Sequence, residues 1–191
     1  MSRLYLVRHG PTHAKSMVGW SDLPADLSDT AALSRLSAHL PEDGMIVSSD
    51  LIRAVHTADA IQDTRSRLPH DPNLREMHFG DWELKRFNEI EAQSPDHIRA
   101  FWETPGDIAP PNGESWNQVC NRVDIAVDRL ITNNLGRDLI LVAHFGVVLT
   151  QIARAEGLSG EEAFSHKIDN LSVTTIHTAG SWFVEAINHN P

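Results

Sequence analysis

Three short apolar runs indicate buried strands. They cover residues 4–7 (LYLV), 45–47 (MIV) and 139–143 (LILVA), and each ends in polar or glycine residues that stop a strand. The third run is the strongest, because five apolar residues in succession are typical of a strand that is covered on both faces. The pattern therefore predicts three strands of a parallel sheet.

Helical signals follow the first two runs. Residues 33–40 form a short amphipathic pattern, which Ser28 or Asp29 can cap at its start. Asp50 directly precedes residues 51–61, whose apolar positions fall on one helical face. We therefore predict a helix after each strand, with Asp50 as the N-cap of the second.

The last third of the chain continues the alternation. A helix is expected at about residues 147–155, and the Ser115-x-x-Gln118 capping box opens a longer one that runs to about residue 133. Residues 173–177 and 182–187 predict two strands of a hairpin. Together these elements predict an α/β fold: a three-layer, open, mostly parallel sheet with helices on both faces and the hairpin at one edge.

Residues 79–115 depart from this pattern. They contain four prolines, several aromatic residues and only short helical pieces. We interpret them as a helical cap inserted into a single domain that spans residues 1–191. The aromatic residues either line a substrate pocket or form a small core beneath the insertion, the second being the commoner arrangement; they are Trp82, Phe87, Phe101, Trp102 and Trp116.

Composition narrows the class of protein. The 191 residues include 16 Lys and Arg against 26 Asp and Glu, a formal net charge of −10. This balance argues against a nucleic-acid partner, and no apolar run approaches the ~20 residues that a membrane span needs. The one cysteine, Cys120, excludes an intramolecular disulfide and is expected to be inert packing. A globular protein of the cytoplasm is the expectation.

The ends of the three strands carry the candidate chemistry. They lead into His9, into Asp50 with the helix behind it, and into His144. The carboxyl ends of neighbouring parallel strands meet at one edge of an open sheet, where ligands bind. We therefore expect His9, His144 and the start of the second helix to lie together.

Arg53 is the next candidate. It falls in the first turn of the predicted helix, where the macrodipole disfavours a cation by ~0.3–1 kcal/mol. A bound anion turns that repulsion into attraction, whereas the alternative is an exposed arginine paired with Asp50 or Asp59. With Arg8, it would suit a phosphate group, which planar guanidinium groups bind through paired hydrogen bonds.

Phosphoryl chemistry also needs a nucleophile and a proton donor. A neutral imidazole can attack phosphorus, and a second imidazole can donate to the developing charge. Glu76, which follows a predicted short strand, is the candidate acid. The alternative for Glu76 is an exposed loop carboxylate.

Four motifs carry a family resemblance. The sequence resembles the histidine phosphatase superfamily, with its phosphoglycerate mutase-like fold, in motifs that follow the family's order along essentially the whole chain. These are RHGPT at residues 8–12, SSDLIRAVHTA at 48–58, LREMHFGDWE at 74–83 and VAHFG at 142–146.

The resemblance implies a role for each matching position. His9 would accept the phosphoryl group, and Glu76 would protonate the leaving oxygen and later help to activate water. No metal or other cofactor would be needed. The implied phosphate-binding residues are Arg8, Arg53, His144, Thr12 and Lys15.

Within the superfamily, residues 77–83 and 111–116 look most like the α-ribazole phosphatase and broad-specificity phosphatase branch. This implies a phosphomonoesterase for a small-molecule phosphate, with α-ribazole 5′-phosphate as one candidate. Phosphoglycerate mutase-type transfer and a non-catalytic phosphate-binding protein are the alternatives. The chain departs from the family at Pro11, Lys15 and Ala31, and these departures leave the substrate preference open. The oligomeric state is also open, and a homodimer is one possibility.

Two other kinds of site fit less well. Residues 10–16 approach a P-loop, but Ala14 stands where a glycine must precede Lys15. A metal site built on His9 and His13 is disfavoured, because Gly10 and Pro11 prevent the helix that would bring both rings to one face.

Overall fold

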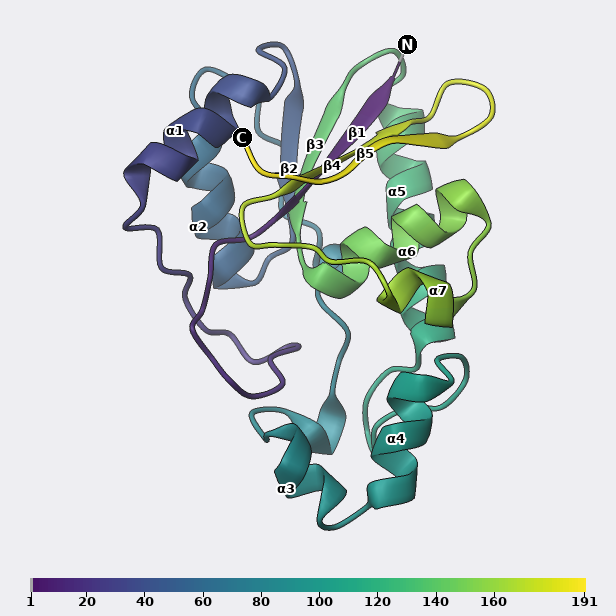
Figure 1. Ribbon diagram of the computed structural model, residues 1–191. Helices are drawn as coiled ribbons and strands as arrows, with labels where there is room; N and C mark the ends of the chain where they lie inside the picture. Colours follow the sequence, from purple (N-terminus) through teal and green to yellow (C-terminus); the bar gives the residue numbers. More distant parts are fainter. Residues whose placement is uncertain (1) are drawn as a thin grey trace.

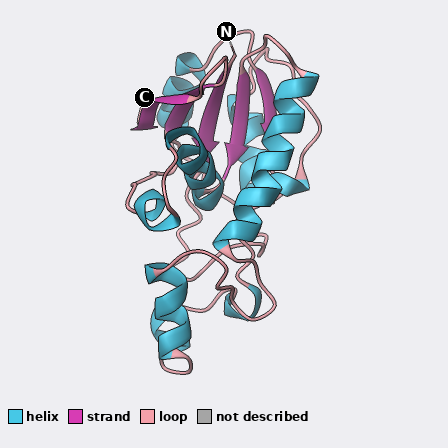
Figure 2. Cartoon of the chain, turned by 90° about the vertical axis from the view of Figure 1, so that its right-hand side faces the viewer, coloured by secondary structure: helices cyan, strands magenta, loops and turns pink. Residues whose placement is uncertain are grey.

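A five-stranded sheet forms the middle layer of the computed structural model, which describes residues 2–191 (Figures 1 and 2). The strand order is β2-β3-β1-β4-β5. β1, β3 and β2 are parallel neighbours, and β4 and β5 form an antiparallel hairpin at one edge, as predicted. The strands are β1 (Arg3–Arg8), β2 (Met45–Ser48), β3 (Leu139–Ala143), β4 (Val173–His177) and β5 (Phe183–His189).

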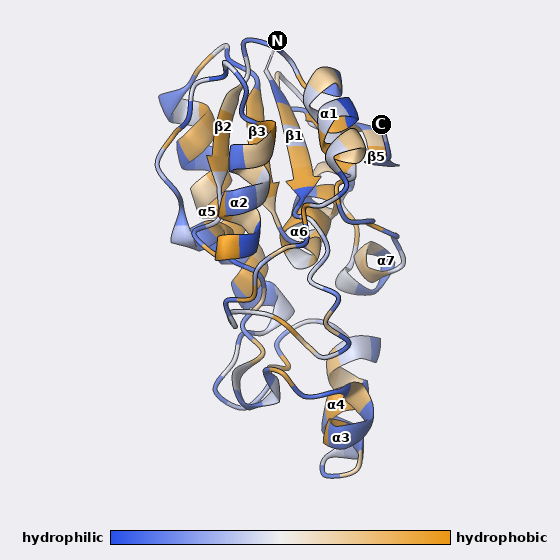
Figure 3. Cartoon of the chain, turned by 90° about the vertical axis from the view of Figure 1, so that its left-hand side faces the viewer, coloured by the Kyte–Doolittle hydropathy of each residue, from blue (hydrophilic) through white to orange (hydrophobic). Residues whose placement is uncertain are grey.

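Helices cover both faces of this sheet, which confirms the three layers. Because side chains alternate along a strand, Leu4 and Leu6 pack with α5 and α6, whereas Tyr5 and Val7 pack with α1 and α2. The three parallel strands β1, β2 and β3 are correspondingly largely apolar (Figure 3). The covering helices are α1 (Thr30–His39) and α2 (Ile52–Ile61) on one face, and α5 (Trp116–Asn133) and α6 (Phe145–Glu156) on the other.

Two capping predictions are confirmed. Asp29 caps α1 by accepting a hydrogen bond from Ala32 N, so that this helix begins at Thr30, three residues before its first predicted position. Ser115 and Gln118 form the expected capping box of α5. Both caps depend on residues adjacent in sequence, which is why the sequence predicts them.

Two other local predictions are wrong. Asp50 does not cap α2, because its carboxylate pairs with Arg75 at 2.7 and 2.5 Å; Asp22 accepts the hydrogen bond from Ile52 N instead. The segment before Glu76 is no strand but a 3₁₀ turn, η1 (Pro72–Leu74). For α2 a partner distant in sequence decides the local structure, whereas η1 is capped locally by Asp71, which accepts from Asn73 N.

The segment between η1 and α5 extends beyond the carboxyl ends of the parallel strands (Figures 1 and 2). It carries η2 (Gly80–Trp82), α3 (Phe87–Glu91) and α4 (Pro95–Glu103), and α7 (Gly160–Phe164) follows α6 later in the chain. The interpretation of residues 79–115 as a cap inserted into one domain stays a prediction.

The aromatic residues of this segment form a core. Trp82, Phe101 and Trp116 are buried in the apolar cluster beneath the sheet, and Trp102 packs against it. Phe87 is the exception, with 44% of its surface exposed. The commoner of the two sequence interpretations, a small core under the insertion, therefore describes four of the five.

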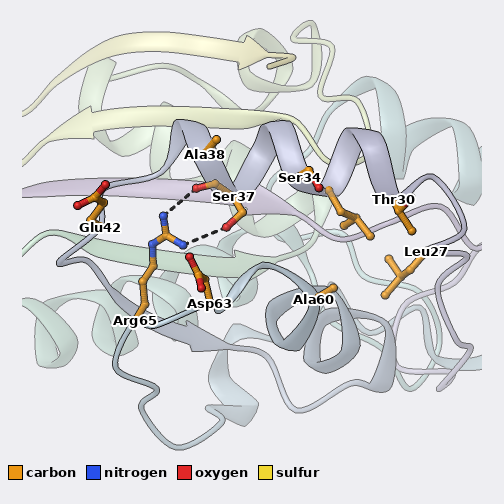
Figure 4. A pocket seen from close by; sticks show the side chains of 10 residues that line it. Leu27, Thr30, Ser34, Ser37, Ala38, Glu42, Ala60, Asp63 and Arg65 are labelled. Carbon is orange, nitrogen blue, oxygen red and sulfur yellow. Dashed lines mark hydrogen bonds between the residues drawn. The ribbon is translucent and has the colours of Figure 1, made fainter.

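Arg65 ties the carboxyl ends of α1 and α2 together. Its guanidinium is buried and donates hydrogen bonds to four backbone carbonyls and one hydroxyl. Figure 4 shows it beneath the last turn of α1, bonded to Ser37, at one end of a groove beside that helix. The last carbonyls of a helix lack partners within it, and a cation also suits the negative end of the helix dipole. Arg65 thereby fixes the position of α2.

We predict that Arg65→Met destabilises the fold by about 3 kcal/mol, because several buried carbonyls lose a charged donor while the apolar stem is retained. Urea unfolding measures the change. Arg137→Met is the matched control, since the Arg137 guanidinium makes one hydrogen bond, to Asp43 O, at an exposed position. Equal losses in the two variants would contradict this role for Arg65.

Candidate active site

Neighbouring strands deliver the two candidate histidines to one place. Arg8 pairs with Ala143 in the parallel register of β1 and β3, so His9 and His144 leave the sheet side by side. Their ring centroids are 5.0 Å apart. The predicted convergence at the carboxyl edge is confirmed.

The protonation state of His9 follows from its contacts. Nδ1 lies 2.6 Å from Gly10 O, and because a carbonyl can only accept, Nδ1 carries the proton. Nε2 therefore keeps its lone pair, which accepts a hydrogen bond from Arg53 Nε at 3.2 Å. Burial, together with the charges of Arg53 and Arg8, lowers the pKa of His9 to about 3. His9 is thus a neutral imidazole at neutral pH.

Arg53 is held by backbone carbonyls. Its side chain is fully buried, and its two terminal nitrogens donate to Ser21 O at 2.9 Å and Gly19 O at 2.6 Å. Its pKa is lowered, chiefly by burial. The alternative of an exposed arginine paired with Asp50 or Asp59 is therefore wrong.

Arg8 and His144 bring unpartnered polar atoms to the same place. Among residues 2–191, neither ring nitrogen of the fully buried His144 has a hydrogen-bond partner, and Arg8 Nε is likewise buried without one. Arg8 Nη1 donates to Ile168 O at 2.5 Å, and the guanidinium lies over the ring of Phe145. Burial lowers the pKa of His144 well below its ordinary value. Buried polar atoms without partners are costly, which marks this place as one that suits a polar ligand.

Glu76 lies against the N-terminus of α6. Its carboxylate accepts hydrogen bonds from Met77 N at 2.9 Å and from Gly146 N at 3.1 Å. Burial raises the pKa of Glu76 in spite of these bonds and of the nearby arginines. A carboxyl group that keeps its proton to higher pH is suited to donate one. The alternative of an exposed loop carboxylate is wrong.

Gly146 has to be a glycine for Glu76 to sit there. A Cβ atom at residue 146 would lie 2.4 Å from Glu76 Oε1, closer than any non-bonded contact allows. The glycine of the fourth motif therefore makes room for the carboxylate of the third.

Arg122 and Glu114 hold the backbone around Glu76, and neither was predicted to have a role in the site. Arg122 donates to the carbonyls of Asn73, Arg75 and Glu76, and it forms an ion pair with Glu114 at 2.7 Å. Glu114 also accepts from His78 N. The sequence did contain a signal for Glu114, because this residue belongs to the motif at residues 111–116. Glu114 contacts the site only through the backbone, which is why its role was not predicted.

These groups surround a cavity of about 200 Å³. Of the predicted site residues, Arg8, His9, Thr12, Arg53 and Glu76 line it, and His144 packs against His9. Lys15 is exposed and does not line the cavity, so its role in phosphate binding stays a prediction. The remaining wall is largely apolar and consists of Ala14, Ser16, Val18, Phe79 and Phe145.

The other candidate chemistries meet no supporting geometry. His13 is exposed and contacts Asp26 at 2.8 Å. Over residues 2–191 no group of three or more His, Cys, Asp or Glu side chains could hold a metal ion, and none of the helices described is long and apolar enough to cross a membrane. Burial raises the pKa of the Cys120 thiol to about 12, which agrees with inert packing.

Comparison with known proteins places this geometry in a family. Residues 4–190 match the model of the histidine phosphatase superfamily (branch 1). The chain is 33% identical to adenosylcobalamin/alpha-ribazole phosphatase of Salmonella typhimurium, over 80% of this chain and 78% of the relative. It is 37% identical to glucosyl-3-phosphoglycerate phosphatase of Mycolicibacterium vanbaalenii, over 82% and 75%.

Among solved structures, Bacillus stearothermophilus YhfR superposes with a TM-score of 0.90 at 30% identity, over 99% of this chain and 98% of that one. The fold, the order of the motifs and the family match agree. The chain belongs to the histidine phosphatase superfamily.

Proposed function

We propose that this protein is a phosphomonoesterase that hydrolyses a small-molecule phosphate through a phosphohistidine at His9. The observation that carries the proposal is the state of His9, which is neutral, with the lone pair of Nε2 beside a guanidinium in a cavity that also holds Glu76. The phosphatase names of the two relatives support the reaction class.

In the first step, His9 Nε2 attacks phosphorus and the bond from phosphorus to the ester oxygen breaks. Glu76 gives its proton to that departing oxygen and becomes a carboxylate. The hydrogen bond from Nδ1 to Gly10 O stabilises the positive charge that the ring gains. Arg8, Arg53 and His144 donate to the three oxygens that stay on phosphorus.

In the second step, the Glu76 carboxylate takes a proton from a water molecule as the water oxygen attacks phosphorus. The bond from phosphorus to Nε2 then breaks and its electron pair returns to the ring. Inorganic phosphate leaves, His9 is neutral again, and Glu76 has regained its proton. One residue thus acts as acid and then as base, for which a raised pKa is suited.

The cavity also bears on the substrate. Arg8 and Arg53 are its only cationic lining residues, both placed for the phosphoryl group, while Val18, Phe79 and Phe145 are apolar. This wall suits the uncharged body of a phosphate monoester better than the carboxylate of a phosphoglycerate. We therefore favour hydrolysis over mutase-type transfer, and α-ribazole 5′-phosphate is a candidate substrate.

We expect His9→Ala to reduce hydrolysis of 4-nitrophenyl phosphate by at least about 10³-fold, because no other group can accept the phosphoryl. The wild-type enzyme, quenched during turnover in alkali, should carry phosphohistidine at residue 9 by mass spectrometry. His13→Ala is the control and should keep full activity. A wild-type protein that neither hydrolyses nor becomes labelled would support the non-catalytic alternative.

The loss in Glu76→Gln should depend on the leaving group. We expect hydrolysis of an alkyl phosphate to fall by about 10²–10⁴-fold, but that of 4-nitrophenyl phosphate far less, because nitrophenolate departs without a proton. Steady-state kcat/KM for the two esters measures the difference. Equal slowing of both would make Glu76 a structural residue.

A substrate panel tests the finer assignment. At matched concentrations we expect α-ribazole 5′-phosphate to exceed 3-phosphoglycerate, sugar phosphates and phosphopeptides in kcat/KM, measured as phosphate release. Isomerisation of phosphoglycerate that outpaces its hydrolysis would replace the phosphatase with a mutase.

A further inference from the structure

Glu83 lies at the centre of a hydrogen-bond cluster beside the site. Its carboxylate accepts five hydrogen bonds, at 2.6–3.2 Å. Four of them come from three successive residues of one loop and the fifth from the turn that bears Glu83 itself. The donors are Gly19 N, Trp20 N, Ser21 N, Ser21 Oγ and Phe79 N.

The same loop holds Arg53. The carbonyls of Gly19 and Ser21 accept from the two terminal nitrogens of Arg53, which leaves Nε directed at His9 Nε2. The N–H groups of these two loop residues thus bind Glu83, while their carbonyls bind the arginine that touches His9.

The loop has no regular secondary structure, and contacts with the rest of the chain fix its shape. One of them is the hydrogen bond from Trp20 Nε1 to Glu76 O at 2.8 Å. Residues 9–29 contain no helix or strand, and a rigid conformation needs partners from elsewhere. Met17 supplies two, through backbone hydrogen bonds to Leu84 N and Lys85 O. At Gly19 the fit is so close that a Cβ atom would lie 2.1 Å from Met77 O and 2.4 Å from Glu83 Oε1.

We propose that Glu83 is a positioning residue for phosphoryl transfer, which orders residues 19–21 so that their carbonyls aim the Arg53 guanidinium at His9 and at the phosphoryl group. The proposal rests on the proposed function, because its main readout is hydrolysis of a phosphate ester. Glu83 touches none of the reacting atoms and acts through the loop.

The chemistry of Glu83 fits this role. Burial acts to raise its pKa, but the hydrogen bonds from Ser21 and from the loop N–H groups outweigh it, so the pKa is lowered and the group is an ionised acceptor. An amide of the same shape has only one acceptor oxygen, and its NH₂ would face N–H donors. Glu83→Gln therefore loosens the loop with almost no change in volume.

The test is a double-mutant cycle of Glu83→Gln and Arg53→Lys, with kcat for 4-nitrophenyl phosphate as the readout. We expect Glu83→Gln alone to lower kcat by about 10- to 100-fold, since a small misplacement of a binding group costs that much. In the Arg53→Lys background the guanidinium is already absent, so adding Glu83→Gln should lower kcat by less than about threefold.

Glu162→Gln is the matched control. Glu162 likewise accepts from a backbone N–H and a serine hydroxyl, both of Ser159, but it caps α7 and does not touch Arg53. It should keep full activity. If Glu83→Gln does not fold, Ser21→Ala removes one bond to Glu83, the shortest, and should lower kcat about two- to fivefold with the same dependence on Arg53.

The pH profile separates positioning from general support of the fold. The charged or titratable groups around His9 are Arg53, Arg8, His144 and Glu76. Burial is the main reason that the pKa of His9 is low, and the charges of Arg53 and Arg8 lower it further. Drift of Arg53 weakens that effect, so the acid limb of kcat/KM should move to higher pH in Glu83→Gln, as it should in Arg53→Lys. A merely structural role would leave the limb in place.

The outcomes are distinguishable. A wild-type enzyme without phosphatase activity would overturn the proposed function. If the wild-type enzyme is active but Glu83→Gln lowers kcat by the same factor with and without Arg53→Lys, the positioning role is overturned and the proposed function stands. The same holds if the acid limb of kcat/KM does not move in Glu83→Gln.

Discussion

The site depends on a histidine that burial keeps neutral between two arginines. His9 donates from Nδ1 to the carbonyl of Gly10, and that single short contact decides that Nε2 is the nitrogen with the lone pair. The adjacent guanidinium groups make the protonated ring unfavourable, and they also supply the donors that a phosphoryl group needs. In the proposed mechanism, the same two charges therefore keep His9 neutral and bind the phosphoryl group that it attacks.

The parallel sheet brings these groups together without an additional structural element. β1 and β3 end at paired positions, so two residues 135 positions apart in the sequence become neighbours without any special loop. α6 starts directly after His144, and the N–H group of Gly146 in its first turn donates to the Glu76 carboxylate. The proposed nucleophile, the second imidazole and the proposed acid are thus placed by strand ends and by one helix N-terminus, which are rigid parts of the fold.

How much of this the sequence predicts depends on the range of the interaction. The strands, the hairpin and the capping box of α5 follow from local patterns, and the meeting of His9 with His144 follows from the topology of parallel sheets. Asp50 failed as a cap because Arg75, 25 residues away, takes its carboxylate. The missed residues share this feature, since Arg122 and Glu83 act on backbone that the sequence shows as unstructured loop.

The partners of the arginines bear on how an acidic protein of net charge −10 would hold the phosphate dianion that we propose as its ligand. Across residues 2–191, Arg75, Arg99 and Arg122 pair with carboxylates, whereas Arg8 and Arg53 form no ion pair and bind backbone carbonyls instead. A carbonyl fixes a guanidinium in place through its dipole but does not cancel its charge. Arg8 and Arg53 are therefore fully positioned and still positive, which is the condition that binding an anion out of water requires.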